Sequence, residues 1–141
     1  MNWAHLTSAL KLGEGAQRAL IVEDDLSFLA RLSAVLLSEG HEVTRAVGVT
    51  TDASGDLFLV FEQAEPRPLT LKDFDIFFLD HYFASKSLNG ELLTRRIRNA
   101  GQQSIMAMSS DSGANERMLR AGANFALRKA DFRRLLPDSG L

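Results

Sequence analysis

Short apolar runs alternate with segments of helical periodicity along most of this chain. Residues 19–22 (ALIV) and 76–79 (IFFL) are the clearest of these runs, and charged residues flank both. Runs of this kind are typical of strands buried on both faces of a sheet. Strands that alternate with helices form right-handed βαβ units, so the pattern predicts a mainly parallel sheet covered by helices on both faces.

Amphipathic spacing predicts the helices between these strands. Leu29, Leu32 and Leu36 recur at helical intervals, and Gly40 is placed to end their helix. Other segments are assigned in the same way: strands at 41–47, 104–109 and 124–128, helices at 89–101 and 115–122, and a short closing helix at 131–136.

Residues 48–75 have the least regular pattern. The segment 50–56 (TTDASGD) has turn residues, 57–64 (LFLVFEQA) is compatible with a helix or a strand, and 65–69 (EPRPL) interrupts either one. We expect a short helix in this region.

Composition narrows the class of protein. The 141 residues are 45% hydrophobic and 24% charged, which is typical of one globular domain. The net charge of −2 and pI near 5.9 argue against a nucleic-acid partner. There is no cysteine for thiol catalysis or a disulfide, and no apolar run reaches about 20 residues. Residues 1–15 lack a basic start and a continuous apolar stretch, so we do not expect them to act as a signal peptide. We expect a cytoplasmic protein without a membrane partner.

Polar side chains follow four of the predicted strands. They are Glu23, Asp24, Asp25, Asp80, Ser109, Ser110 and Lys129. The carboxyl ends of parallel strands lie on one edge of the sheet, where ligands bind. Carboxylates gathered there repel one another unless a cation lies between them, and oxygen ligands suit a hydrated Mg²⁺. An acid, a metal, a hydroxyl and a lysine together suit phosphoryl transfer, with the acid as nucleophile.

The motifs LIVEDD, FFLD, MAMSS and LRK, in this order, give the chain a resemblance to a known family. Residues 19–136 resemble the receiver domain of response regulators, the CheY-like module of two-component signalling. The resemblance implies an α/β, flavodoxin-like, doubly wound fold with a five-stranded parallel sheet in the order 2-1-3-4-5. Residues 1–18 would be an N-terminal extension, expected to be helical, and residues 137–141 a tail.

The resemblance also implies a role for each residue that matches the family's motifs. Asp80 would be the phosphoacceptor, Ser109 would hydrogen-bond a phosphoryl oxygen, and Lys129 would pair with the phosphoryl group. The implied ligands of Mg²⁺ (or Mn²⁺) are Glu23, Asp24, Asp80 and the backbone carbonyl of Tyr82.

The sequence departs from the family at several points. Ala130 follows Lys129 where most receivers have proline, and Ala126 replaces the usual switch aromatic. The stretch from 46 to 75 is about ten residues longer than its counterparts. Twelve residues follow Lys129, which predicts a short final helix. The N-terminal residues Trp3, Leu6, Leu10 and Leu12 have helical spacing, and we expect this segment to dock near the last strand or to pair with another subunit.

Each of these polar residues also has a simpler explanation when it is considered alone. The acids at 23–25 could cap a helix, Asp80 could cap a turn, and Ser109 with Ser110 could form a turn or an N-cap. Lys129 could be a solvated lysine. Their coincidence at one edge of the sheet, in the family's order, favours the shared site.

Three functions are compatible with these residues. The first is a receiver that accepts a phosphoryl group on Asp80 from a histidine kinase or phosphotransfer protein, and signals to a downstream protein as a monomer or weak homodimer. It would not be an enzyme beyond its own phosphorylation and slow dephosphorylation. The second is a receiver-like interaction module that works without phosphorylation, as Ala126 and Ala130 suggest. The third, a metal-dependent phosphohydrolase, is disfavoured because Tyr82 stands where a second acid is needed.

Overall fold

Five parallel strands form the main sheet in the computed structural model, which describes residues 1–137. They are β1 (Arg18–Val22), β2 (Glu42–Ala46), β6 (Ile76–Leu79), β7 (Ser104–Ala107) and β8 (Phe125–Ala126). Their order is β2-β1-β6-β7-β8, with every neighbouring pair parallel. Taken in chain order, this is the predicted order 2-1-3-4-5, so the flavodoxin-like fold is confirmed.

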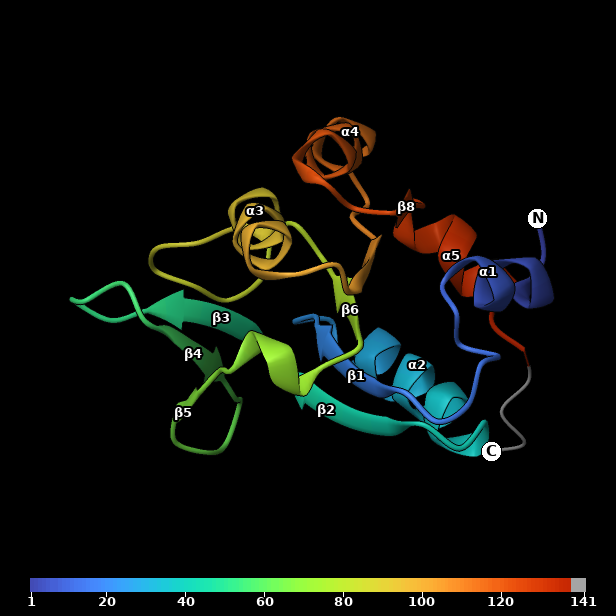
Figure 1. Cartoon of the computed structure of the whole chain (residues 1–141), viewed down its shortest axis with the longest axis horizontal. Helices are drawn as coiled ribbons and strands as arrows, with labels where there is room; N and C mark the ends of the chain where they lie inside the picture. Colours follow the sequence, from blue (N-terminus) through green and yellow to red (C-terminus); the bar gives the residue numbers. More distant parts are fainter. Residues whose placement is uncertain (138–141) are drawn as a thin grey trace.

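In the described part of the chain, five helices cover this sheet: α1 (Trp3–Ala9), α2 (Leu26–Ser38), α3 (Gly90–Ala100), α4 (Ser112–Ala121) and α5 (Lys129–Leu135). Alternate residues of each buried strand point to opposite faces. Ile21 therefore packs in a core cluster with residues of α1, α2 and α5, whereas Leu20 packs in a second cluster with residues of α3 and α4. Figure 1 shows these two groups of helices on opposite sides of the strands.

Local sequence signals account for the ends of the helices beside the site. The side chain of Asp25 accepts a hydrogen bond from the Phe28 N–H at the start of α2. Of the three consecutive acids at 23–25, Asp25 is therefore a helix cap. Asp111 caps α4 by accepting from the Gly113 N–H. Gly40 has a φ of 90° just beyond α2, in the left-handed region that glycine adopts readily.

The prediction of a short helix within residues 48–75 is wrong. Instead β3 (Gly48–Thr51), β4 (Leu57–Val60) and β5 (Arg67–Pro68) form an antiparallel sheet, followed by the 3₁₀ turn η1 (Leu71–Asp73). In β4 the buried Leu57 and Leu59 alternate with half-buried residues, which is the period of a strand. This small sheet occupies the place of the helix that usually connects parallel strands (Figure 1).

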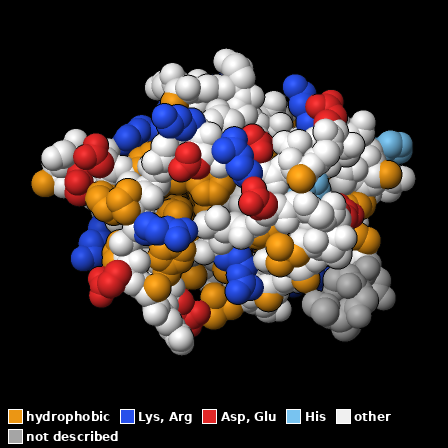
Figure 2. Space-filling view, turned by 60° about the horizontal axis from the view of Figure 1, so that its bottom comes forward, with side chains coloured by type: hydrophobic (Ala, Val, Ile, Leu, Met, Phe, Trp, Pro, Cys, Tyr) orange, Lys and Arg blue, Asp and Glu red, His pale blue; other side chains and the backbone are white. Residues whose placement is uncertain are grey.

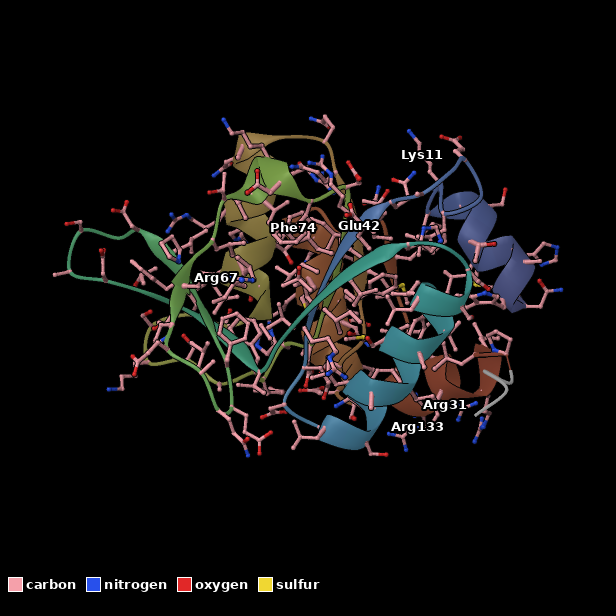
Figure 3. The ribbon with its side chains drawn as sticks, turned by 90° about the horizontal axis from the view of Figure 1, so that it is seen from below. Lys11, Arg31, Glu42, Arg67, Phe74 and Arg133 are labelled. Atoms are coloured by element: carbon pink, nitrogen blue, oxygen red, sulfur yellow. The ribbon has the colours of Figure 1, made fainter. Side chains whose placement is uncertain are left out.

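The small sheet leaves a cavity of about 500 Å³ between itself and β2. Glu42 of β2, Arg67 of β5 and Phe74 are among its lining residues, and Figure 3 shows them around this space. Figure 2 shows hydrophobic and charged side chains intermixed on the side of the molecule that carries β3–β5. This cavity is remote from the carboxyl ends of the strands, where the site residues lie.

Helix α1 packs against the rest of the molecule. Leu6 and Leu10 are fully buried in the core cluster that contains Phe132 of α5, and the indole N–H of Trp3 donates to Glu39 Oε2. Figure 1 shows α1 beside α5. Within residues 1–137, no helix combines the length and the apolar character needed to cross a membrane. Residues 138–141 of the predicted tail lie outside the described part.

Candidate functional site

The register of the main sheet places the predicted site residues along one edge. Val22, Leu79, Ala107 and Ala126 are aligned in one row across four neighbouring strands. The site residues follow this row by one to three positions: Glu23 and Asp80 by one, Asp24 and Ser109 by two, and Lys129 by three. Because the strands are parallel, these side chains emerge at the same edge of the sheet.

Three carboxylates converge at this edge. Glu23, Asp24 and Asp80 each offer an oxygen, and these oxygens lie within 4.8 Å of one another. Glu23 and Asp80 are buried, whereas Asp24 is exposed. The cluster thus has two acids in the protein interior and a third open to water.

Lys129 joins the two buried acids. Its Nζ donates to Glu23 Oε1 at 2.6 Å and to Asp80 Oδ2 at 3.4 Å. Lys129 is the first residue of α5, so the position of that helix sets the position of its side chain. Ala130 follows it, in place of the proline expected from the resemblance. Strand β8 is two residues long, shorter than the strand predicted at 124–128. Lys129 is separated from it by two residues and lies at the start of α5.

Burial is the largest influence on the pKa values of Glu23 and Asp80. Burial raises the pKa of Glu23 to about 7, although Lys129 acts in the opposite direction. Burial also raises the pKa of Asp80, against the charge of Lys129 and the hydrogen bond from the His81 N–H. Burial alone would lower the pKa of Lys129, but Glu23 and Asp80 more than offset this effect and leave it raised.

The acidic cluster fits a divalent cation. Glu23 Oε2 is buried and has no hydrogen-bond partner within residues 1–137, which is an unfavourable state unless another group contacts it. The ligand set is all oxygen, the preference of Mg²⁺ and Mn²⁺. Glu23, Asp24 and Asp80 are therefore the residues that could hold the ion.

Ser109 follows β7, the strand beside Asp80. It is buried and held through its backbone, because its N–H donates to Asn115 Oδ1 and its carbonyl accepts from Asn115 Nδ2. Its Oγ accepts from the Asp111 N–H at 3.2 Å. The hydroxyl proton of Ser109 takes no part in that bond.

His81 directly follows Asp80 in the sequence, and its side chain is buried beside the acceptor loop. Its N–H donates to Asp80 Oδ1 at 2.7 Å, and its Nδ1 accepts from the Glu91 N–H at 3.3 Å. Burial, with a smaller contribution from Arg117, lowers the pKa of His81. An isolated polar residue after a strand gave no signal of this packing.

Tyr82 lies beyond His81 on the surface of the site. Its side chain is 57% exposed, and its hydroxyl donates to Asp111 Oδ2 at 3.1 Å. The two rings of His81 and Tyr82 meet edge to face, with centroids 4.6 Å apart. Tyr82 thus connects the loop after Asp80 to the start of α4; the metal contact of its backbone carbonyl stays a prediction.

Gly90 sets the close approach of α3 to this loop. Its N–H donates to the His81 carbonyl at 2.9 Å. A Cβ at this position would lie 2.6 Å from the Asp80 carbonyl oxygen and 2.7 Å from His81 Cα. Glycine is therefore needed here because the backbone of the acceptor loop occupies the space of a side chain.

Comparison with known proteins identifies the fold. No protein-family model and no curated protein matches the sequence. Among solved structures, a response regulator from Chloroflexus aurantiacus is 20% identical, with 86% of this chain and 98% of that chain covered and a TM-score of 0.55.

Two other structural neighbours have informative descriptions. The receiver domain of a sensor histidine kinase from Pseudomonas aeruginosa, with a magnesium ion in its active site cleft, is 23% identical, with 86% and 95% covered and a TM-score of 0.54. A Burkholderia pseudomallei response regulator with a phosphorylated aspartic acid is 13% identical, with 86% and 67% covered and a TM-score of 0.54. The chain therefore has the fold of response-regulator receiver domains, the CheY-like modules of two-component systems.

Proposed function

We propose that this protein is a receiver of two-component signalling that is phosphorylated on Asp80. The observation that carries the proposal is the convergence of Glu23, Asp24 and Asp80 within 4.8 Å, with Lys129 bonded to two of them. The phosphoryl donor would be a phosphohistidine of a histidine kinase or phosphotransfer protein. Structural neighbours that carry magnesium or a phosphorylated aspartate support this assignment.

In the transfer step, a carboxylate oxygen of Asp80 attacks phosphorus and the P–N bond of the phosphohistidine breaks. The imidazole leaves with the electron pair of that bond and takes up a proton, and Asp80 becomes an acyl phosphate. In dephosphorylation, a separate reaction, water attacks phosphorus and the bond between phosphorus and the Asp80 oxygen breaks. The Asp80 carboxylate is restored, and inorganic phosphate leaves with the oxygen and the protons of the water. Lys129, already 3.4 Å from Asp80 Oδ2, would hold a phosphoryl oxygen.

A bound Mg²⁺ or Mn²⁺ would neutralise charge on the phosphoryl oxygens during transfer. Glu23, Asp24, Asp80 and the carbonyl of Tyr82 would hold the ion. Ser109 would donate its hydroxyl proton to a phosphoryl oxygen while its own oxygen keeps the Asp111 N–H.

The signal would pass to a downstream protein through a changed surface. We place the protein in the cytoplasm as a monomer or weak homodimer, with neither nucleic acid nor membrane as a direct partner. It would catalyse no reaction beyond its own phosphorylation and slow dephosphorylation.

An interaction module that works without phosphorylation is the second candidate. Ala126 lies in β8 where receivers usually carry the aromatic residue that responds to phosphorylation, and it offers no ring. In this second function, the ion pairs of Lys129 would simply stabilise one fixed surface.

Incubation with acetyl phosphate separates the two candidates. With Mg²⁺ we expect an acid-stable, base-labile adduct of one phosphoryl group, detected by intact mass. Asp80→Asn should abolish it, and Asp24→Asn should raise the Mg²⁺ concentration required. Asp56→Asn, at an exposed acid between β3 and β4, is the matched control and should have no effect. An unmodified wild-type protein at every Mg²⁺ concentration would favour the phosphorylation-independent module.

A further inference from the structure

Helix α5 begins with Lys129 and is held by packing at Phe132 and by Arg133, whose guanidinium pairs with Asp25 Oδ2 at 3.4 Å and lies over the Phe28 ring. It is seven residues long, its N-cap Arg128 makes no side-chain capping bond, and Phe132 is the buried residue within it. Helices of this length are unstable alone in water, so packing must hold α5. The position of Lys129 therefore depends in large part on the rings that surround Phe132, the buried residue of this helix.

Three aromatic rings from three different elements surround Phe132. Phe28 of α2 meets it edge to face with centroids 5.8 Å apart, and Phe78 of β6 lies at 6.2 Å. Trp3 of α1 completes the set at 6.3 Å, also edge to face. Edge-to-face aromatic pairs are favourable beyond their buried area, so Phe28 and Trp3 both contribute to the placement of α5, and the tilted ring of Phe78 adds a packing contact.

Trp3 is itself held in place. Its indole N–H donates to Glu39 Oε2 at 2.8 Å, at the end of α2. Leu6 and Leu10 bury the inner face of α1, and Ser104 at the start of β7 donates to the Leu10 carbonyl at 3.3 Å. Helix α1 is thus fixed to α2 and the main sheet at the place where its indole contacts α5.

The same aromatic group reaches the charged site. Lys129 Nζ lies 5.9 Å from the centre of the Phe28 ring, and Phe28 is the ring that packs on Phe132. A continuous set of contacts therefore runs from Trp3 through Phe132 and Phe28 to Lys129, and from Lys129 to Glu23.

We propose that Trp3 of helix α1 is a positioning residue for Lys129, so that a segment preceding the receiver-like part of the chain controls the geometry of the phosphorylation site. The placement of Lys129 is independent of the proposed function, and its effect on phosphorylation rests on that function. Loss of the Trp3 ring would free α5 to move and would release Lys129 from Glu23 and Asp80.

Lysine labelling tests the placement directly in the full chain. Lys129 has a side chain that is 14% exposed and paired with two acids, so an N-hydroxysuccinimide ester should label it slowly, whereas the exposed Lys86 should react readily. Trp3→Ala should raise labelling of Lys129 several-fold, relative to Lys86. Trp3→Phe keeps an aromatic ring, and labelling of Lys129 in this variant should be as slow as in the wild type. His5→Ala, on the exposed side of α1, should also leave the labelling of Lys129 slow.

Phosphorylation by acetyl phosphate gives the second readout. Trp3→Ala should lower the rate several-fold in the wild-type background and have no further effect in Lys129→Ala, because Trp3 acts through Lys129. A purely structural role would lower both rates equally. Unchanged labelling of Lys129 in Trp3→Ala, or in the milder Trp3→Leu if the first variant melts, overturns the inference. Absence of phosphorylation in the wild type would refute the proposed function, and labelling would still decide the role of Trp3.

Discussion

Lys129 Nζ lies 2.6 Å from Glu23 Oε1 and 3.4 Å from Asp80 Oδ2, although 106 and 49 residues separate these partners along the chain. One ammonium group thereby compensates two buried carboxylates. A buried carboxylate without a partner is strongly unfavourable. The free energy of unfolding should therefore depend on the charges of Lys129, Glu23 and Asp80.

Lys129→Met should destabilise the protein in a pH-dependent way. At pH 8 the variant leaves Glu23 and Asp80 without a cation, and we expect a loss of about 3 kcal/mol in the free energy of unfolding. At pH 5 the loss should be smaller, because Glu23 then takes up a proton. Urea denaturation at both pH values measures the difference. Lys86→Met, at an exposed position, should cost less than about 0.5 kcal/mol; equal losses for Lys129→Met at both pH values would contradict the buried pairing.

The raised pKa of Glu23 predicts how stability varies with pH in the wild type. The folded protein holds the Glu23 proton up to a pKa of about 7, whereas the unfolded chain releases it near 4.5. With respect to Glu23 the folded state therefore binds more protons between these values, and this group should lower stability by up to about 3 kcal/mol as pH rises from 5 to 8. The lowered pKa of His81 contributes with the opposite sign. Glu23→Gln should flatten this dependence in urea denaturation without divalent ions. A slope unchanged in Glu23→Gln would assign the effect to another group.

Gly90→Ala should disturb the acceptor loop. Alanine favours helices over glycine by about 1 kcal/mol, so propensity alone predicts stabilisation at this first residue of α3. The added Cβ would instead press on the Asp80 carbonyl and His81 Cα, and we expect a net loss of about 2 kcal/mol by thermal or urea unfolding. Gly13→Ala is the control, since no atom lies within 4 Å of its Cβ position. A Gly90→Ala variant as stable as the wild type would show that the loop relaxes freely.

On the proposed function, Tyr82 should prolong the phosphorylated state of Asp80. Its ring follows the acceptor by two residues and is bonded to Asp111, and we expect it to hinder attacking water. Tyr82→Ala should raise the rate of phosphate loss several-fold. Tyr82→Phe removes only the hydroxyl, so comparison of the two variants separates the ring from the hydrogen bond. The decay of the isolated phosphoprotein, followed by mass spectrometry, measures both rates. Equal lifetimes for the wild type and Tyr82→Ala would rule out shielding by this side chain.

The main sheet and the position of the site were predictable because the relevant signals are local. Residues 19–22 and 76–79 are apolar on both faces, as central parallel strands must be, and parallel strands bring Glu23, Asp24 and Asp80 to one edge. The caps Asp25 and Gly40 follow the same local chemistry.

Residues 48–75 were not predictable in this way. Leu57 to Val60 are four consecutive apolar residues, and such a run has no period that distinguishes a strand from a helix. The structure buries Leu57 and Leu59 against the second core cluster and pairs β4 with β3, so tertiary packing selects the strand. The burial of His81 likewise depends on the approach of α3 at Gly90.

The amino-acid sequence alone predicted the alternation of the main-sheet strands with helices and the edge at which the acids gather, because burial periodicity, helix caps and chain direction are properties of neighbouring residues. Tertiary structure decided the rest: the small sheet β3–β5, the burial of His81, the Tyr82–Asp111 bond and the packing of Trp3 on Phe132. These features join segments that are distant in the chain. Their stability comes from contacts between those segments, which a pattern of neighbouring residues cannot predict.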